Sequence, residues 1–286
     1  MGEAFTLSDG RALGYAEWGD GAPVFGFHGT SLSRLAHVGE DAPRTTGVRL
    51  ILVDRPGYGL SDHQPERTLL DWSRDIAELA DGLGVSQFGV FGMSGGGPHA
   101  AACAYALRDR VSSLGLVSSP APVWDLPELR FSAPPHRRPL IELAERDPGL
   151  VASHLLEDCR AELERMAVDS RNGGKGDGPE ADQAVMADPE VRARFEAATR
   201  ETIGRGPEGY ARDLFLLYVA PWGFRPEEIA VPTQIWHGDA DEAVSPRIAE
   251  YFAETIPESR LHLIPGAGHL LLWSHTEEIL TSLKPT

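Results

Sequence analysis

Short apolar segments alternate with helical patterns along the first 120 residues, and no other feature constrains the fold as strongly. The apolar segments end in polar or glycine-rich turns and lie at 24–27, 48–53, 88–91 and 111–117. The clearest helical patterns between them cover 69–83 and 98–107. Strands and helices that alternate in this way form βαβ units around a parallel sheet buried on both faces. The sequence therefore predicts an α/β fold with a mostly parallel central sheet flanked by helices.

Two segments depart from this alternation. Near the N-terminus, apolar residues alternate on both sides of Asp9-Gly10, which predicts a β-hairpin. From about residue 122 to residue 225 the sequence predicts helical stretches broken by Pro and Gly, with no clear strand. Within this segment, 171–179 is predicted to be a loop, because it has nothing to bury.

The alternation returns after this segment. Strands are expected at 233–236 and 261–264, and helices at 246–255 and 275–283. We therefore expect a core of residues 1–121 and 226–286. A helical cap of residues 122–225 is inserted after the strand at 111–117, and its length is within the range of a domain.

Charge and composition exclude several classes of protein. The 286 residues carry a formal net charge of −17, so nothing would neutralise the phosphates of a nucleic acid. No apolar run is long enough to span a membrane, and no signal peptide is apparent, so we expect a cytoplasmic protein that acts on a small molecule. The two cysteines are too few for a disulfide framework, and Cys103 is expected to be a buried thiol. We expect no cofactor and no metal, and the oligomeric state stays open.

The sharpest motif is Gly92-Met93-Ser94-Gly95-Gly96, which follows a predicted strand and precedes a predicted helix. A G-x-S-x-G motif in this context is typical of a nucleophile elbow, in which a strained turn projects the serine hydroxyl above the sheet. The flanking glycines let the strand and the helix approach without side-chain clashes. The motif makes Ser94 the candidate nucleophile.

With this motif, the chain resembles the α/β-hydrolase superfamily over nearly its whole length, and 122–225 is the weakest part of the match. Four more segments carry the resemblance: the oxyanion loop His28-Gly29-Thr30, the D-x-x-G-x-G-x-S turn from Asp54 to Ser61, the acid loop Gly238–Val244 and the base loop Gly266–His269. They occur in the family's order. The resemblance implies an α/β-hydrolase fold with a helical cap.

A serine hydroxyl needs a base within hydrogen-bond reach, and a carboxylate must hold that base in the correct tautomer. His269 is the candidate base, since it follows a late strand in a glycine-rich loop. Asp241 is the preferred acid, and Asp239 is expected to turn its own loop. Asp125 is the alternative acid, because some members of the superfamily place the acid after the preceding strand.

The resemblance implies an oxyanion hole made of the backbone N–H groups of Thr30 and Gly95. Six other residues are candidates for substrate contacts: His28, Ser31, Met93, Trp124, Tyr218 and Trp222. Asp54 is expected to cap its turn or to form an ion pair, and Arg34 is expected on a solvated helix face.

The expected activity is that of a carboxylic ester hydrolase. Ser94 attacks the carbonyl of a small or medium-sized, largely apolar ester or lactone, and the resulting acyl-enzyme is hydrolysed. Two alternatives stay open. Relatives with such a triad also include non-hydrolytic enzymes of secondary metabolism, such as cyclases and lyases, and C–C bond hydrolases. The other alternative is a ligand-binding protein without catalysis, against which a complete triad argues.

Overall fold

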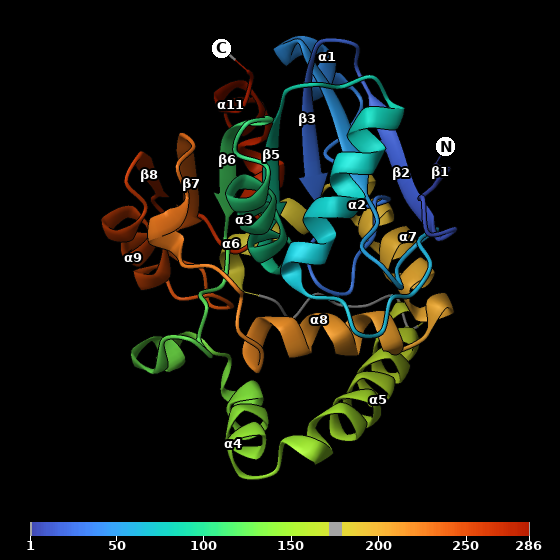
Figure 1. Ribbon diagram of the computed structural model, residues 1–286, viewed down its shortest axis with the longest axis vertical. Helices are drawn as coiled ribbons and strands as arrows, with labels where there is room; N and C mark the ends of the chain where they lie inside the picture. Colours follow the sequence, from blue (N-terminus) through green and yellow to red (C-terminus); the bar gives the residue numbers. More distant parts are fainter. Residues whose placement is uncertain (1, 172–178, 286) are drawn as a thin grey trace.

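The computed structural model describes residues 2–171 and 179–285 and confirms the α/β fold. Its centre is an eight-stranded sheet in the order β1-β2-β4-β3-β5-β6-β7-β8 (Figure 1). β2 is antiparallel to both of its neighbours, and all other pairs are parallel. The strands are β1 (Glu3–Thr6), β2 (Ala12–Trp18), β3 (Ala22–Phe27), β4 (Val48–Val53), β5 (Phe88–Met93), β6 (Val111–Val117), β7 (Thr233–Gly238) and β8 (Ser259–Ile264).

The apolar runs of the sequence form the predicted strands, and the predicted hairpin at Asp9-Gly10 joins β1 to β2. Gly10 has a φ of 90°, a left-handed conformation that glycine adopts without steric cost. Four strands are longer than predicted: β3 and β8 each begin two residues earlier, and β5 and β7 each end two residues later. β8 is only half-buried, because it lies at the edge of the sheet.

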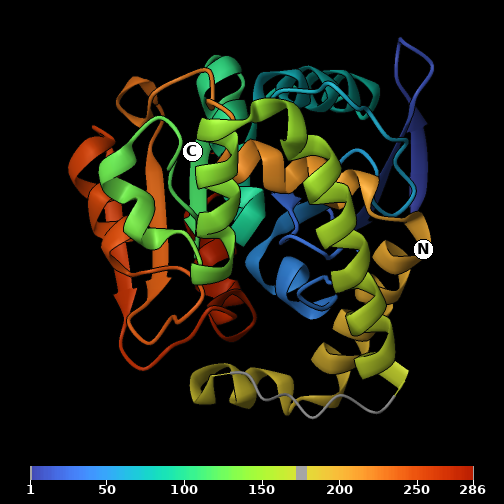
Figure 2. The same cartoon turned by 90° about the horizontal axis from the view of Figure 1, so that it is seen from below.

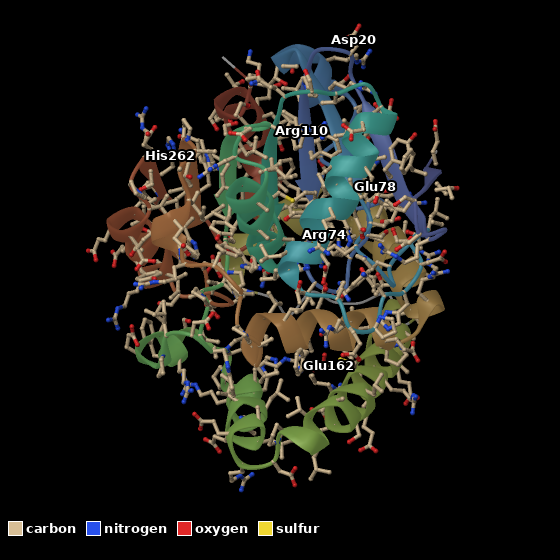
Figure 3. All side chains as sticks on the ribbon, viewed as in Figure 1. Asp20, Arg74, Glu78, Arg110, Glu162 and His262 are labelled. Atoms are coloured by element: carbon tan, nitrogen blue, oxygen red, sulfur yellow. The ribbon has the colours of Figure 1, made fainter. Side chains whose placement is uncertain are left out.

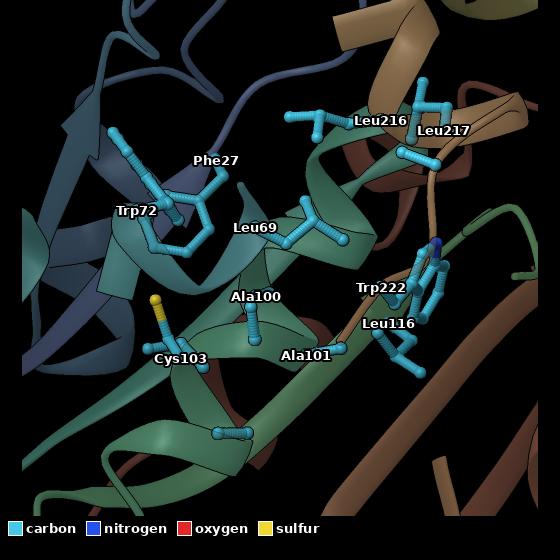
Figure 4. Packing of buried hydrophobic residues seen from close by; sticks show 14 of the residues in the cluster. Phe27, Leu69, Trp72, Ala100, Ala101, Cys103, Leu116, Leu216, Leu217 and Trp222 are labelled. Atoms are coloured by element: carbon cyan, nitrogen blue, oxygen red, sulfur yellow. The ribbon is translucent and has the colours of Figure 1, made fainter. Parts of the chain in front are cut away.

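Helices cover both faces of the sheet, so its strands contribute alternate residues to two apolar clusters. Val90 of β5 packs with α2 and α3 on one face, and Phe91 packs with Leu280 of α11 on the other. Figure 4 shows the first cluster around Trp72 and Ala100. The helices of the core are α1 (Asp41–Thr46), α2 (Leu69–Gly82), α3 (Gly97–Ala106), α9 (Arg247–Thr255), α10 (Leu271–Ser274) and α11 (Thr276–Ser282).

The chain between β6 and β7 forms helices and, in its described residues, no strand, as the sequence predicts. The helices are α4 (Arg138–Arg146), α5 (Val151–Arg171), α6 (Glu180–Met186), α7 (Pro189–Arg205) and α8 (Glu208–Tyr218). In Figure 1, α8 crosses below the carboxyl ends of the parallel strands, and Figure 2 shows the yellow-green helices of this segment in front of the sheet. The predicted loop at 171–179 lies mostly outside the described residues.

A partly buried polar contact joins two of these helices. Glu162 of α5, labelled in Figure 3, accepts hydrogen bonds from Tyr210 of α8 at 2.5 Å and from Arg137 at 2.8 Å. This contact fixes α5 against α8. Among the described residues, no helix combines the length and the apolar character needed to cross a membrane.

Candidate active site

Ser94 lies in a strained turn between β5 and α3. It has a φ of 51°, and it begins a short 3-10 helix, Ser94–Gly96, that leads into α3. Within 88–104, Ser94 is the one residue that is not fully buried. A Cβ on Gly92 would lie 2.1 Å from the carbonyl oxygen of Gly96, so only glycine allows strand and helix to approach this closely. The turn therefore presents one hydroxyl at the surface of a buried segment.

Left-handed backbone recurs at the same edge of the sheet. Ser31 has a φ of 62° and Ser118 a φ of 47°; with Ser94 they are the non-glycine residues of positive φ in the described chain. They follow β3, β5 and β6, which are consecutive in the sheet. Backbone strain is thus concentrated at the carboxyl ends of the central strands, where catalytic residues of such folds lie.

His269 and Asp241, the candidate base and acid, are in direct contact. The imidazole Nδ1 lies 2.9 Å from Asp241 Oδ2, and the Asp241 side chain is fully buried. The other oxygen, Oδ1, accepts hydrogen bonds from the backbone N–H groups of Ala243 and Val244. Because a carboxylate accepts at Nδ1, that nitrogen carries the proton and Nε2 is left with its lone pair.

A second imidazole contacts the same carboxylate. His237 Nε2 lies 3.3 Å from Asp241 Oδ2 and 3.0 Å from the carbonyl oxygen of Val244. Burial alone raises the pKa of Asp241, but the hydrogen bonds from His237 and His269 outweigh burial and lower that pKa well below its ordinary value. No role was predicted for His237 from the sequence.

The acid and base loops are joined directly. Asp239 Oδ1 accepts a hydrogen bond from the backbone N–H of Gly266 at 2.6 Å, and the N–H of Ala240 donates to Ala267 O at 3.0 Å. The expectation that Asp239 turns its own loop is therefore wrong, because its carboxylate reaches across to the next loop. Asp182 of α6 also accepts from the N–H of Leu270, beside His269, at 2.8 Å. No local signal in the sequence predicted that contact.

Ser94 and His269 lie at the same edge of the sheet. Met93 pairs with Val117, and the next residue after Val117, Ser118, donates from Oγ to the carbonyl oxygen of His269 at 3.1 Å. In the described chain no hydrogen bond joins Ser94 Oγ to His269. Such bonds are often long without substrate and shorten when substrate binds.

Thr30 and Gly95, the predicted oxyanion donors, lie against each other. A Cβ on Gly95 would lie 2.1 Å from Thr30 Oγ1 and 3.3 Å from Cδ1 of Leu217, a residue of α8. The N–H of Thr30 has no acceptor among the described residues. Gly95 is the second residue of its helix, where N–H groups have no partner within the helix. Both donors are thus available beside Ser94, below an apolar side chain of α8.

Asp125, the alternative acid, is engaged elsewhere. Its Oδ2 accepts a hydrogen bond from the backbone N–H of Trp222 at 2.9 Å, and the residue is exposed. The carboxylate at Nδ1 of His269 is that of Asp241.

The other candidate substrate contacts differ in exposure. His28 is buried, with Nδ1 on the carbonyl oxygen of Gly29 and Nε2 accepting from the N–H of Arg55, so neither ring nitrogen is left for a substrate. Met93 and Trp222 are also buried, and Trp222 packs against Phe224. The half-buried candidates are Ser31, Trp124 and Tyr218.

Arg34 is not on a solvated face, and that expectation is wrong. It is 5% exposed and forms ion pairs with Asp54 at 2.6 Å and with Glu201 of α7 at 3.0 Å. The expected ion pair of Asp54 is present. Among the residues that the structure describes, no group of three or more His, Cys, Asp or Glu side chains is arranged to hold a metal ion.

Comparisons with known proteins find relatives that are named as hydrolases or esterases. The chain is 26% identical to a 2-hydroxy-6-oxononadienedioate/2-hydroxy-6-oxononatrienedioate hydrolase of Burkholderia vietnamiensis over 84% of this chain and 77% of that protein. It is 30% identical to the uncharacterized hydrolase YcgS of Bacillus subtilis over only 42% of either chain. A thermophilic esterase from Thermogutta terrifontis has a similar structure, with a TM-score of 0.67 and 26% identity over 99% of this chain and 96% of that chain.

The family model described as alpha/beta hydrolase fold matches residues 26–276, which is most of the chain. The protein is therefore a hydrolase that belongs to the α/β-hydrolase fold family.

Proposed function

We propose that this protein hydrolyses a small or medium-sized, largely apolar carboxylic ester or lactone through an acyl-enzyme on Ser94. The hydrogen bond from His269 Nδ1 to Asp241 is the observation that carries the proposal. It leaves Nε2 as the basic nitrogen, and a neutral imidazole with a free Nε2 is the base that a serine nucleophile needs. The half-buried Ser94 supplies the nucleophilic hydroxyl at the same edge of the sheet.

The reaction has two halves. Ser94 Oγ attacks the ester carbonyl, His269 Nε2 takes the hydroxyl proton, and the oxyanion accepts hydrogen bonds from the N–H groups of Thr30 and Gly95. His269 then protonates the leaving alcohol. In the second half a water molecule gives its proton to His269 and attacks the acyl carbon, which releases the carboxylic acid and returns the proton to Ser94.

Two observations favour an apolar and uncharged substrate. Leu217 of α8 lies over Gly95, so the segment between β6 and β7 places hydrocarbon beside the reacting carbonyl. The formal net charge of −17 opposes the approach of anions. We propose that residues 122–225 act as a cap that encloses this substrate, with Ser31, Trp124 and Tyr218 lining its path.

One comparison favours a second function, the hydrolysis of a C–C bond beside a ketone. The Burkholderia relative is named for a dienedioate, a substrate with two carboxylates, and it matches 84% of this chain. The same Ser94 and His269 would then act on a ketone carbonyl in place of an ester.

The test combines turnover with labelling. We expect the protein to hydrolyse short p-nitrophenyl esters, and we expect a fluorophosphonate probe to attach to Ser94, as located by peptide mass spectrometry. Ser94→Ala is expected to lose both reactions. Retention of ester hydrolysis by Ser94→Ala contradicts the mechanism, whereas labelling of Ser94 without ester turnover supports the second function.

A further inference from the structure

A buried arginine holds the loop that carries Thr30. Arg55, the second residue after β4, is fully buried, and its Nη1 donates to the carbonyl oxygen of His28. Its Nη2 lies 3.3 Å from the carbonyl oxygen of Gly29, which also accepts from Nδ1 of His28 at 2.9 Å. Two consecutive carbonyl groups of the oxyanion loop therefore point toward Arg55.

The orientation of the Gly29 carbonyl determines the orientation of the Thr30 N–H. In a trans peptide unit the C=O of one residue and the N–H of the next point in opposite directions. The chain has no cis peptide bond among its described residues. Because the Gly29 carbonyl faces Arg55, the Thr30 N–H faces away from it. The Thr30 side chain lies against Gly95, the other predicted donor.

Arg55 is anchored by a helix of the segment between β6 and β7. Asp213 of α8 is fully buried, and its Oδ2 lies 2.8 Å from Arg55 Nε and 2.7 Å from Nη2. Its Oδ1 pairs with Arg67, which is also fully buried. Burial alone raises the pKa of Asp213, but the charges of Arg55 and Arg67 outweigh it and lower that pKa well below its ordinary value. Asp213 is thus a charged anchor for Arg55.

We propose that Arg55, held by Asp213 of α8, is a positioning residue that sets the direction of the Thr30 N–H and so keeps the oxyanion hole formed. The inference rests on the proposed acyl transfer at Ser94. The Gly29 carbonyl also accepts from His28 Nδ1 and, at 3.3 Å, from the N–H of Leu32, and Arg55 is the one of its three donors that α8 anchors. A displacement of α8 would release the Gly29–Thr30 peptide and lower the rate of the chemical step, with little effect on the binding of the ester.

The structure offers a matched control in Arg67. Arg55 and Arg67 are both fully buried and both pair with Asp213, but in the described structure Arg67 makes no hydrogen bond to the oxyanion loop. Asp213 pairs with both arginines and lies 3.7 Å from His99 Nε2, so Arg55→Met and Arg67→Met each leave one arginine and the same imidazole beside it. Both substitutions remove one buried ion pair, and they differ in the contact with His28 and Gly29.

Steady-state hydrolysis of a p-nitrophenyl ester by the full chain tests the proposal. Loss of one oxyanion donor lowers kcat by about 100- to 1000-fold, and a misdirected donor is expected to lower it by at least about 30-fold. We expect that decrease in Arg55→Met with KM within about threefold of wild type, and kcat within about threefold of wild type in Arg67→Met. Equal decreases in the two variants, or a raised KM with unchanged kcat in Arg55→Met, would overturn the proposal.

Two further measurements keep the test decisive. If Arg55→Met does not fold, as judged by circular dichroism, the same comparison is made between Arg55→Lys and Arg67→Lys, since lysine keeps the charge but lacks the planar set of donors. If wild type hydrolyses no ester, the rates at which a fluorophosphonate labels Ser94 replace kcat, because phosphonylation uses the same oxyanion hole. A wild-type protein that is neither active nor labelled refutes the proposed function, whereas an active one with equal variants refutes only the role of Arg55.

Discussion

The backbones of Gly57 and Gly209 are in direct contact: a Cβ on Gly57 would lie 2.6 Å from Gly209 Cα. Gly57 belongs to the turn that carries Arg55, and Gly209 is in the first turn of α8, the helix that carries Asp213. Gly57 has a φ of 90°, so the turn needs glycine for its conformation as well as for the contact. This contact brings α8 close enough for Asp213 to reach Arg55.

Gly57→Ala is expected to lower the free energy of unfolding by about 2–4 kcal/mol, because it adds a steric clash to the cost of a left-handed alanine. Gly10 is the matched control, since it has the same φ of 90° and a Cβ there would meet nothing within 4 Å. Gly10→Ala is expected to cost only about 1 kcal/mol. Urea unfolding of both variants measures the difference, and equal losses would show that the contact with Gly209 is unimportant.

Asp241→Asn is expected to lower kcat for an ester by about 10⁴-fold, because an amide in place of the carboxylate favours the wrong tautomer of His269. Asp125→Asn is expected to leave kcat within about twofold, since its side chain bonds to the N–H of Trp222 and an asparagine oxygen still accepts that bond. Steady-state kinetics of the two variants decides between the two carboxylates. The reverse order of effects would make Asp125 the acid.

The free energy of unfolding is expected to decrease as the pH is lowered, and His99 contributes part of this decrease. Burial lowers the pKa of His99 to about 3, whereas an unfolded histidine titrates near 6.5. Between these values the unfolded chain binds a proton that the native chain does not bind, so the free energy of unfolding falls by about 1.4 kcal/mol per pH unit as pH decreases.

His99→Asn removes this titration and keeps a donor for the carbonyl oxygen of Gly95, which now accepts from Nδ1 of His99. Its unfolding free energy is expected to depend less steeply on pH, by about 1.4 kcal/mol per unit between pH 6 and pH 4. Urea titrations at several pH values measure the two slopes. Identical slopes would mean that His99 is charged in the folded protein.

Both thiols are expected to be unreactive in the folded protein. Cys103 and Cys159 are free and fully buried, and burial raises the pKa of Cys159 to about 12. Because the thiolate is the reactive form, Ellman's reagent at pH 8 is expected to modify neither thiol until the chain is unfolded in guanidinium, and then both. Rapid modification of the native protein would show an open path to one of them, and Cys159→Ala would identify which.

The sequence predicts those parts of the fold that depend on local pattern. Buried strands require apolar runs, so β4 and β6 begin and end where the runs do. The elbow at Ser94 is recognisable because its glycines are required by contacts within the motif itself, such as Gly92 with Gly96.

Contacts between distant segments were not predictable. The sequence predicts a solvated side chain for Arg34. One of its partners, Glu201, lies 167 positions away, and nothing near Arg34 in the sequence indicates the ion pair. His237 has its partner Asp241 only four residues away, yet the contact depends on the extension of β7 by residues of no apolar pattern. The ion pair of Asp213 with Arg55 was not predicted either, because the two residues are far apart in the sequence and meet only when α8 lies across the sheet.

The left-handed conformation of Ser94 has a consequence for the evolution of this chain. A non-glycine residue at such a φ costs about 1–2 kcal/mol, which glycine avoids. Selection for thermal stability alone would therefore favour glycine at position 94 and so remove the proposed nucleophile. A screen for more stable variants of this protein must therefore measure turnover in every round, because stability and activity favour different residues at position 94.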